Sequence, residues 1–356
     1  MTRFNSEQVK RFGELIRRSG TIIITCHICP DGDALGSSLG LLNLIHEINP
    51  AATAVVVTPD EPTRNLAFLP RFSDIQPFSR YHKRLSKLIE QADLIVCLDF
   101  NALMRIDRLA PSISESSAVK ILIDHHLEPE PFADIVFSFP EKCATSMLLY
   151  ELIEEAGLDG AITPVVADCL LAGMMTDTGD FTYNVADPDI YSVIGKLISK
   201  GADKARLTRL LFDTVTEESM RIQGFALSRR MQVFKEMHAA LIVLSQEDLN
   251  QYGYSKGDTE GLVNKPLAIP GVLYSCFLRQ ETDYVKVSMR SLGDLPVNEI
   301  CQRYYNGGGH LNAAGGEFYD SMEQSILTFK NSLPVIKKEF IDDNKVLESI
   351  LKDELH

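Results

Sequence analysis

The stretch TIIITCHICPDGDA, residues 21–34, decides the fold. It opens with a β-branched run, Thr21–Cys26, and then carries a histidine and two aspartates before a helical pattern begins at Ala34. A short, wholly apolar run that follows an amphipathic helical pattern is typical of a strand buried on both faces. We therefore predict a central strand over residues 21–26, with polar residues at its carboxyl end.

Strands of this kind alternate with helices throughout the first half of the chain. Further apolar runs occur at Ala54–Thr58, Asp93–Leu98 and Val119–Ile123. Alternation of buried strands with helices is typical of an α/β fold, in which a parallel sheet has helices on both faces. The helical patterns lie near residues 6–18, 34–48, 143–156 and 163–175, and a fifth opens at Asp187-Pro188.

The second half of the chain predicts a smaller α/β domain. A charged, helix-prone stretch from Asp203 to Glu236 indicates a helical connector. We predict a first domain over residues 1–200, a connector over 201–236, a second domain over 237–340 and a C-terminal tail over 341–356. Within the second domain, strand patterns lie at His238–Leu244, Gly271–Leu278 and Asp283–Met289, and helical patterns at Val297–Tyr304 and Ser321–Leu333.

Acidic side chains outnumber basic ones in this chain. There are 49 aspartates and glutamates against 35 lysines and arginines, and the formal net charge is −14. Proteins that hold long duplex DNA need a broadly basic surface, so long duplex DNA is not expected as a partner. A short anionic ligand is compatible with the composition if a cation, or a local cluster of arginine and histidine, supplies positive charge.

The sequence carries no signal for export or membrane insertion. Its first twenty residues are charged throughout and lack the apolar core of a signal peptide. The best uncharged apolar run, Ala34–Ile45, is too short to span a membrane. Seven cysteines, an odd number, favour reduced thiols. We therefore expect a cytoplasmic protein without a membrane partner.

Cys26 and Cys29 form a C-x-x-C pair. Such pairs occur in redox-active sites and as halves of zinc sites. The pair lies at the end of a predicted strand, and the sequence contains no second C-x-x-C. We interpret the two cysteines as bystanders, and the histidine between them as the functional residue.

Acids and histidines gather where the predicted strands end. The carboxyl ends of parallel strands meet at one edge of a sheet, which is where open α/β sheets bind ligands. A single aspartate could instead cap a helix. Several such groups at one edge favour a metal centre, because an unpaired buried carboxylate is costly. His27, Asp31 and Asp33 follow the first strand, Asp99 the third, Asp124, His125 and His126 the fourth, and Asp177 the helix over 163–175.

The donor types indicate which ions such a centre prefers. Carboxylates and imidazoles without thiolates favour Mn²⁺, Mg²⁺ or Co²⁺ over structural zinc. Five or more donors exceed the usual protein share of one ion and indicate two. Two ions about 3.5–4 Å apart, bridged by one carboxylate, serve phosphoryl hydrolysis by a metal-activated water.

A second polar motif lies in the second domain. Residues 306–316 read NGGGHLNAAGG, in which Gly308, Gly309 and His310 can bring backbone N–H groups close to an anion. No Lys-Ser or Lys-Thr follows the glycines, so the segment is not a P-loop, and a flexible turn is the alternative. Arg290, at the end of a predicted strand, offers a bidentate fork for phosphate, and an ordinary surface arginine is the alternative there.

Taken together, these motifs resemble those of the DHH phosphoesterases. The segment 307–316 resembles the glycine-rich signature of their DHHA1 domain, so the resemblance implies a DHH domain followed by a DHHA1 domain with a mixed sheet. In size and domain content the chain is similar to the nanoRNase/pAp phosphatase subgroup. The four matching motifs are His27-x-x-Pro30-Asp31-Gly32-Asp33-Ala34, Asp99, Asp124-His125-His126 and Thr176-Asp177-Thr178-Gly179.

The resemblance also implies a role for each motif residue. Asp99 and His126 would be the catalytic residues, with Asp99 bridging two ions and His126 contacting the substrate phosphate and assisting the leaving group. His27, Asp31 and Asp99 would hold one ion, and Asp33, Asp99, His125 and Asp177 the other. Arg290, Gly308, Gly309 and His310 would bind substrate.

The activity implied by the resemblance is that of a manganese-dependent hydrolase. It would cut short single-stranded oligoribonucleotides (nanoRNA) to mononucleotides and convert pAp to AMP, using two Mn²⁺ ions. One alternative is the same fold acting on polyphosphate, pyrophosphate or linear dinucleotides such as pApA and pGpG. Another is a catalytically silent nucleotide-binding regulator, which the intact ligands at every motif disfavour. A homodimer is compatible with the sequence.

Overall fold

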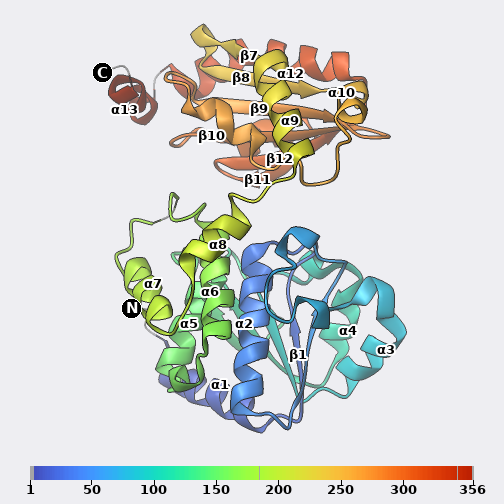
Figure 1. Ribbon diagram of the computed structural model, residues 1–356, viewed down its shortest axis with the longest axis vertical. Helices are drawn as coiled ribbons and strands as arrows, with labels where there is room; N and C mark the ends of the chain where they lie inside the picture. Colours follow the sequence, from blue (N-terminus) through green and yellow to red (C-terminus); the bar gives the residue numbers. More distant parts are fainter. Residues whose placement is uncertain (1–3, 184, 343, 355–356) are drawn as a thin grey trace. The chain divides into compact units, whose positions relative to one another are not determined.

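The structure is a computed structural model that describes residues 4–183, 185–342 and 344–354 (Figure 1). The chain divides into two compact units, Met1–Thr214 and Val215–His356. The division falls within the segment 201–236 that the sequence marks as a connector. In the described residues, each unit contains one six-stranded sheet and its own apolar core.

A parallel sheet forms the centre of the first unit. Its strand order is β3-β2-β1-β4-β5-β6, and each neighbouring pair is parallel. The strand order reverses between β1 and β4, and ligands of open α/β sheets bind at such a point. The strands are β1 (Thr21–Thr25), β2 (Thr53–Thr58), β3 (Gln76–Pro77), β4 (Leu94–Leu98), β5 (Val119–Asp124) and β6 (Ile135–Ser138).

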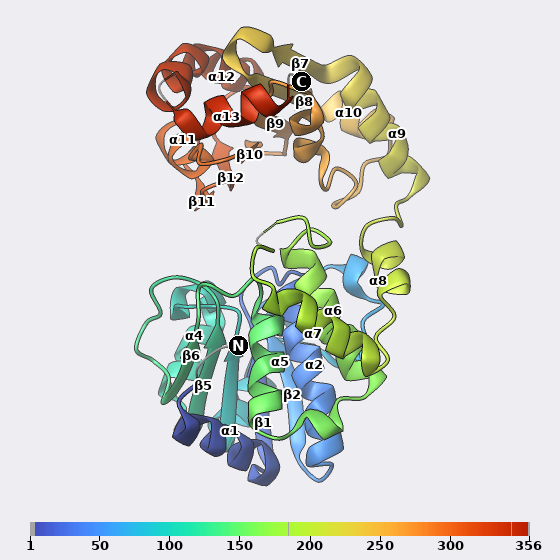
Figure 2. The ribbon, with the colours of Figure 1, turned by 90° about the vertical axis from the view of Figure 1, so that its left-hand side faces the viewer.

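Helices cover both faces of this sheet. The helices of the first unit are α1 (Ser6–Arg18), α2 (Gly32–Ile48), α3 (Phe78–Glu90), α4 (Ala110–Glu115), α5 (Thr145–Glu155), α6 (Pro164–Asp177), α7 (Asp189–Ser199) and α8 (Lys204–Leu211). Figures 1 and 2 show helices on either side of the sheet. Ile22 and Ile24 pack on one face against α1, α2, α5 and α6, whereas Ile23 packs on the other face against α3 and α4. Burial on both faces explains why the β1 sequence is an uninterrupted apolar run.

Helices α2 and α6 touch through their backbones. A Cβ atom added to Gly36 of α2 would lie 2.6 Å from the carbonyl oxygen of Cys169 and 2.9 Å from Cα of Gly173, both on α6. Glycine at position 36 therefore allows the two helices to approach closely. The contact matters for the site because α2 carries Asp33 in its first turn and α6 ends at Asp177.

A mixed sheet forms the centre of the second unit. Its order is β11-β12-β10-β9-β8-β7, in which β8 and β9 are parallel and the other pairs are antiparallel. The strands are β7 (Met231–Phe234), β8 (Ala239–Leu244), β9 (Tyr274–Gln280), β10 (Val285–Ser291), β11 (Gly308–His310) and β12 (Ala313–Phe318). The helices are α9 (Glu217–Phe225), α10 (Gln246–Gln251), α11 (Val297–Tyr304), α12 (Met322–Ile336) and α13 (Lys345–Glu354).

The two faces of this mixed sheet have different surroundings. Val287 of β10 packs on one face with α11, α12 and Leu347 of α13. Phe277 of β9 packs on the opposite face with Ile222 of α9 and with a 3₁₀ helix, Leu262–Ala268. On that opposite face, β10, β12 and β11 line a pocket of about 570 Å³.

The predicted architecture, a parallel α/β sheet followed by a smaller mixed-sheet domain, is confirmed. Helices α1 and α11 begin and end at the predicted residues. Three strands of the second sheet lie where no strand is predicted: β7 occupies the end of the segment predicted to be helical, and β11 and β12 occupy the glycine-rich segment. Each of them depends on pairing with a distant partner strand. Among the described residues, no helix is both long and apolar enough to cross a membrane.

Candidate metal centre

Two donors lie at the point where the strand order reverses. His27 follows β1 and Asp99 directly follows β4, and these two strands are neighbours. Asp99 adopts the left-handed conformation, with φ of 64°, and its N–H donates to the carbonyl of Ile123 (3.1 Å). Aspartate enters this conformation more readily than most residues. The turn carries its carboxylate into the protein, where Asp99 is only 2% exposed.

The two carboxylate oxygens of Asp99 face different histidines. Oδ2 lies 3.5 Å from Nε2 of His27, and Oδ1 lies 3.5 Å from Nε2 of His125. Oδ1 also accepts a hydrogen bond from the hydroxyl of Thr145 (3.0 Å). One carboxylate therefore lies between two donor groups and faces each of them with one oxygen.

Asp31 and Asp33 both stand at the start of α2 but have different partners. Oδ1 of Asp31 accepts from two backbone N–H groups of the first turn and caps the helix, while its Oδ2 lies 3.6 Å from Nε2 of His27. Asp33 is fully buried and accepts from the backbone N–H groups of Thr145 (2.6 Å) and Ser146 (2.9 Å), at the start of α5. The capping interpretation thus holds for Asp31, whereas a second helix positions Asp33.

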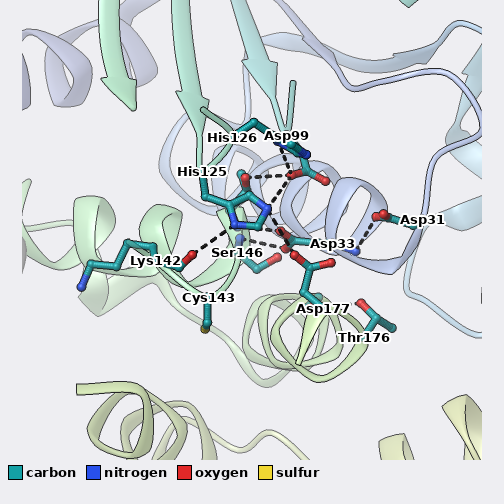
Figure 3. A network of polar contacts seen from close by, with 12 residues as sticks. Asp31, Asp33, Asp99, His125, His126, Lys142, Cys143, Ser146, Thr176 and Asp177 are labelled. Carbon is teal, nitrogen blue, oxygen red and sulfur yellow. Dashed lines mark hydrogen bonds and ion pairs between the residues drawn. The ribbon is translucent and has the colours of Figure 1, made fainter. Parts of the chain in front are cut away.

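His125 lies between the carboxylates of Asp33, Asp99 and Asp177 (Figure 3). Its Nε2 lies 3.2 Å from Oδ2 of Asp177, at the end of α6. Its Nδ1 donates to the carbonyl of Lys142 (3.1 Å), as Nδ1 of His27 does to the carbonyl of Ile28 (2.8 Å). Such bonds fix the orientation of a metal-binding histidine, and they leave a lone pair on Nε2 of the neutral ring.

Asp124 orients His126. The Asp124 carboxylate is fully buried at the end of β5, where it accepts from the backbone N–H (3.1 Å) and from Nδ1 (2.7 Å) of His126. The ring of His126 packs edge-on against that of His125, with centroids 4.8 Å apart. Because Nδ1 is engaged by Asp124, a bond from His126 to a ligand would come from Nε2.

All of the predicted metal ligands lie in one cluster. It consists of three overlapping groups of donors, and within each group the donor atoms lie within 4.8 Å of one another. The groups are His27 with Asp31 and Asp99, Asp33 with His125 and Asp177, and Asp99 with His125 and His126.

The pKa values of these side chains reflect a concentration of negative charge. Burial would lower the pKa of His27, but the carboxylates of Asp31 and Asp99 raise it to about 11. Burial likewise opposes the neighbouring carboxylates at His125, which raise its pKa to about 12. Burial and repulsion from Asp99 raise the pKa of Asp33, while the two histidines hold the pKa of Asp99 well below its usual range despite its burial. The cluster therefore favours added positive charge.

Divalent cations fit this donor set. The Nε2 atoms of His27 and His125 face carboxylate oxygens at 3.2 to 3.6 Å, and in the neutral rings these atoms carry lone pairs. Both kinds of atom are acceptors, so a proton or a cation is needed between them. Ligands bonded at about 2.0–2.2 Å to one ion, at right angles, lie about 3 Å apart. The observed separations are close to that spacing.

The two cysteines next to His27 do not join the donor groups. Cys26 is buried, and burial raises the pKa of its thiol far above the usual value, which keeps it a neutral thiol. Cys29 is exposed, and its backbone N–H donates to Asp60 (2.8 Å). The seven cysteines, which all lie in the described part of the chain, are outside disulfides.

The predicted substrate residues gather in the second unit. Arg290 and Gly308 line the 570 Å³ pocket, together with Lys286 and Tyr284. His310 pairs with Ala313 across β11 and β12, and Ala313 pairs with Arg290 across β12 and β10. Gly309 has φ of 140°, a conformation that suits glycine. The glycine-rich segment is thus a paired hairpin, with a turn at Leu311 and Asn312 between its strands.

Several residues of the donor cluster and of the pocket could not be identified from the sequence. Thr145 and Ser146 hold Asp33 only because α5 starts beside α2, and the Lys142 carbonyl acts through its backbone, which no side-chain pattern reports. Lys286 and Tyr284 belong to the pocket only because β10 pairs with β12. Asp124, which the sequence places at a strand end with His125 and His126, bonds His126 and does not join a donor group.

Two family models match the chain in the order of its two units. The model described as DHH family, N-terminal domain, matches residues 21–174, and the DHHA1 domain model matches residues 237–340. The chain therefore belongs to the DHH family, with a DHHA1 domain as its second part.

The chain is similar over most of its length to two NrnA proteins and to one solved structure. The bifunctional oligoribonuclease and PAP phosphatase NrnA of Thermus thermophilus is 31% identical over 314 residues, which cover 87% of this chain and 88% of that protein. NrnA of Bacillus subtilis is 29% identical, over 86% of this chain and 93% of that protein. Among solved structures, an exopolyphosphatase-related protein from Bacteroides fragilis is 42% identical with a TM-score of 0.91, covering 95% of this chain and 100% of that chain.

Proposed function

We propose that this chain is a two-metal phosphoesterase that hydrolyses short oligoribonucleotides to mononucleotides and also converts pAp to AMP. The observation that carries the proposal is the placement of Asp99, whose two oxygens face His27 and His125 in separate donor groups. Similarity to the NrnA proteins over most of both chains supports the choice of substrates.

Manganese is the proposed ion, with Mg²⁺ and Co²⁺ as alternatives. The first ion would be held by His27, Asp31 and Asp99. A mixed set of carboxylates and imidazoles suits an ion of intermediate hardness, which favours Mn²⁺ over Mg²⁺. When bound, such ions neutralise charge on a phosphoryl oxygen and lower the pKa of an attacking water. The second ion would be held by Asp33, Asp99, His125 and Asp177.

The chain's own residues supply the remaining chemistry. His126, with Nδ1 engaged by Asp124, presents Nε2 to the scissile phosphate and assists departure of the leaving oxygen. Arg290, Gly308, Gly309 and His310 bind a phosphate of the substrate through guanidinium and backbone N–H groups. With a net charge of −14, the chain favours a short anionic substrate held by such local groups over a long one.

Polyphosphate is the second candidate substrate. The observation in its favour is the 42% identity to the exopolyphosphatase-related protein from Bacteroides fragilis. A chain of phosphates could use the metal centre and the basic residues of the pocket without any contact to a base.

A substrate panel separates these candidates. The purified protein is assayed with Mn²⁺ on labelled RNA of two to five nucleotides, a long RNA, pAp, pApA and polyphosphate. We expect the short RNAs and pAp to be hydrolysed with kcat/KM well above that for the long RNA, and all activity to be lost in EDTA. Release of phosphate from polyphosphate without cleavage of short RNA would overturn the proposed function in favour of the second candidate.

A further inference from the structure

An aromatic pair stands at one end of the pocket in the second unit. Tyr284 directly precedes β10 and Tyr319 directly follows β12. Their ring centroids are 5.8 Å apart and the ring planes are inclined by 44°. Tyr319 is 66% exposed, so most of its ring surface is accessible.

The strand register places this pair on the face that lines the pocket. Val285 pairs with Phe318 and Lys286 pairs with Glu317. Successive residues of a strand point to opposite faces, and Val285 is buried in the core, so Tyr284 and Tyr319 lie on the same face as Lys286 and Glu317. The hydroxyl of Tyr319 donates to the carboxylate of Glu317, which restrains the ring.

The charge along this face changes from one end to the other. Arg290 stands at the end near the glycine-rich hairpin, and Lys286 lies four residues closer to the aromatic pair. Glu317 stands beside the tyrosines, where its negative charge opposes a phosphate. A nucleobase, by contrast, offers N–H donors to a carboxylate and a flat surface to an aromatic ring.

We propose that Tyr284 and Tyr319 form a stacking site for a nucleobase of an oligonucleotide whose phosphate is bound at Arg290. The inference rests on the proposed function and adds a specificity element to it. Arg290 lies six residues after Tyr284 along the extended strand, a distance of about 20 Å. That distance exceeds the length of one nucleotide, so a di- or trinucleotide reaches both ends and pAp does not.

The test compares a trinucleotide with pAp in the full-length protein. Base stacking on an aromatic side chain contributes about 5- to 150-fold to binding. We expect the double variant Tyr284→Leu/Tyr319→Leu to lose about 10-fold or more in kcat/KM on the trinucleotide and a much smaller factor on pAp. Tyr319→Phe, which keeps the ring, should retain activity on both substrates. The matched control is Tyr191→Leu, an exposed tyrosine on α7, which should change neither.

Three trinucleotide analogues, each with a single abasic position, identify the stacked base. Wild-type protein should discriminate against one of them, and the double variant should lose that discrimination. Equal losses on the trinucleotide and pAp, no loss on either, or a loss with Tyr319→Phe as large as with the double variant would each overturn the stacking site.

A binding measurement keeps this inference separable from the proposed function. Affinity for the trinucleotide is measured by titration calorimetry in EDTA, where no hydrolysis occurs. If wild-type protein hydrolyses neither substrate but binds the trinucleotide more tightly than the double variant does, the proposed function fails and the stacking site stands. Equal affinity of the two proteins would overturn the stacking site.

Discussion

At the scale of single residues, the backbone conformation of Asp99 determines where its carboxylate lies. A non-glycine residue in the left-handed region costs about 1–2 kcal/mol, and this cost is tolerated where it places a functional group. Here it directs one buried carboxylate toward two histidines. Asparagine adopts the same backbone conformation readily, whereas alanine does not. The two substitutions therefore separate the chemistry of the carboxylate from its backbone geometry.

Asp99→Asn and Asp99→Ala should both lose bound metal and reduce turnover by about 10³-fold, because the ligand between the two donor groups is gone. Asp99→Ala should additionally lower the free energy of unfolding by about 1–2 kcal/mol relative to Asp99→Asn. Metal content by atomic emission, turnover and chemical denaturation measure the three effects. Either variant retaining its metal and near-normal turnover would contradict the two-metal assignment.

Asp124→Asn tests how His126 is oriented. An amide in place of the buried carboxylate cannot accept both hydrogen bonds from His126, so activity should fall by about 10- to 100-fold while metal content stays unchanged. Steady-state kinetics and metal analysis provide the measurement. If Asp124 acts through the ring, Asp124→Asn should add no further loss to His126→Ala. An additive loss in the double variant would assign Asp124 a separate role.

At the scale of elements, the metal centre depends on how closely α2 and α6 approach. Each helix supplies one carboxylate, Asp33 and Asp177, and their separation is set by the glycine contact at position 36. Interiors are packed densely enough that one extra methyl group is felt. A change at position 36 can therefore displace two carboxylates of the proposed metal centre.

Gly36→Ala should lower the free energy of unfolding by about 1–3 kcal/mol, because its methyl group would meet the α6 backbone at 2.6 Å. The matched control is Gly195→Ala in α7, where no atom lies within 4 Å of the added Cβ. There alanine should raise stability by about 0.5–1 kcal/mol through its better helix propensity. Urea denaturation of both variants gives the comparison. A Gly36→Ala variant as stable as wild type would mean that the helices separate without cost.

Two neighbouring glycines at the β11–β12 hairpin, Gly307 and Gly308, provide a second comparison of this kind. A Cβ at Gly307 would lie 1.9 Å from the carbonyl oxygen of Gly315, while a Cβ at Gly308 meets nothing within 4 Å and enters the pocket. Gly307→Ala should therefore lower Tm by several degrees, about 1–3 kcal/mol in stability. Gly308→Ala should keep Tm and raise KM for short RNA. Unchanged kinetics in Gly308→Ala would remove this glycine from the substrate site.

At the scale of the whole molecule, the donors and the basic pocket belong to different units. The donor groups lie between His27 and Asp177, and the pocket residues between Tyr284 and Glu317. Because of this division, a substitution can impair the proposed metal binding of the first unit or the proposed phosphate binding of the second unit separately. Binding energy from a remote phosphate positions the scissile bond, so its loss should affect substrates unequally.

Arg290→Ala should retain metal but reduce kcat/KM for short RNA and pAp by about 10- to 100-fold, the contribution of a hydrogen-bonded charged group. Bis-p-nitrophenyl phosphate, which lacks a second phosphate, should be affected far less. The matched control is Arg221→Ala on α9, an exposed arginine paired with Glu217. The measured quantity is the ratio of the two losses in kcat/KM. Equal losses on both kinds of substrate would show that Arg290 is not a remote phosphate anchor.

The amino-acid sequence by itself determined the class of fold and the edge at which donors gather. Strand β1 is one residue shorter than the predicted run 21–26, and α1 and α11 begin and end at the predicted residues. These features follow from the local periodicity of apolar residues, which can be identified from consecutive positions of the sequence. Because parallel strands end at one edge, His27 and Asp99 could be brought together without knowledge of the packing.

Only the tertiary structure decided the features that depend on pairing between distant segments. The glycine-rich segment has weak intrinsic strand propensity, and its hairpin exists because β12 pairs with β10. Thr145 holds Asp33 across 112 residues of sequence, and Tyr284 meets Tyr319 only through the register of two strands. Register and helix contact are set by the summed packing of the whole unit, so no local pattern encodes them.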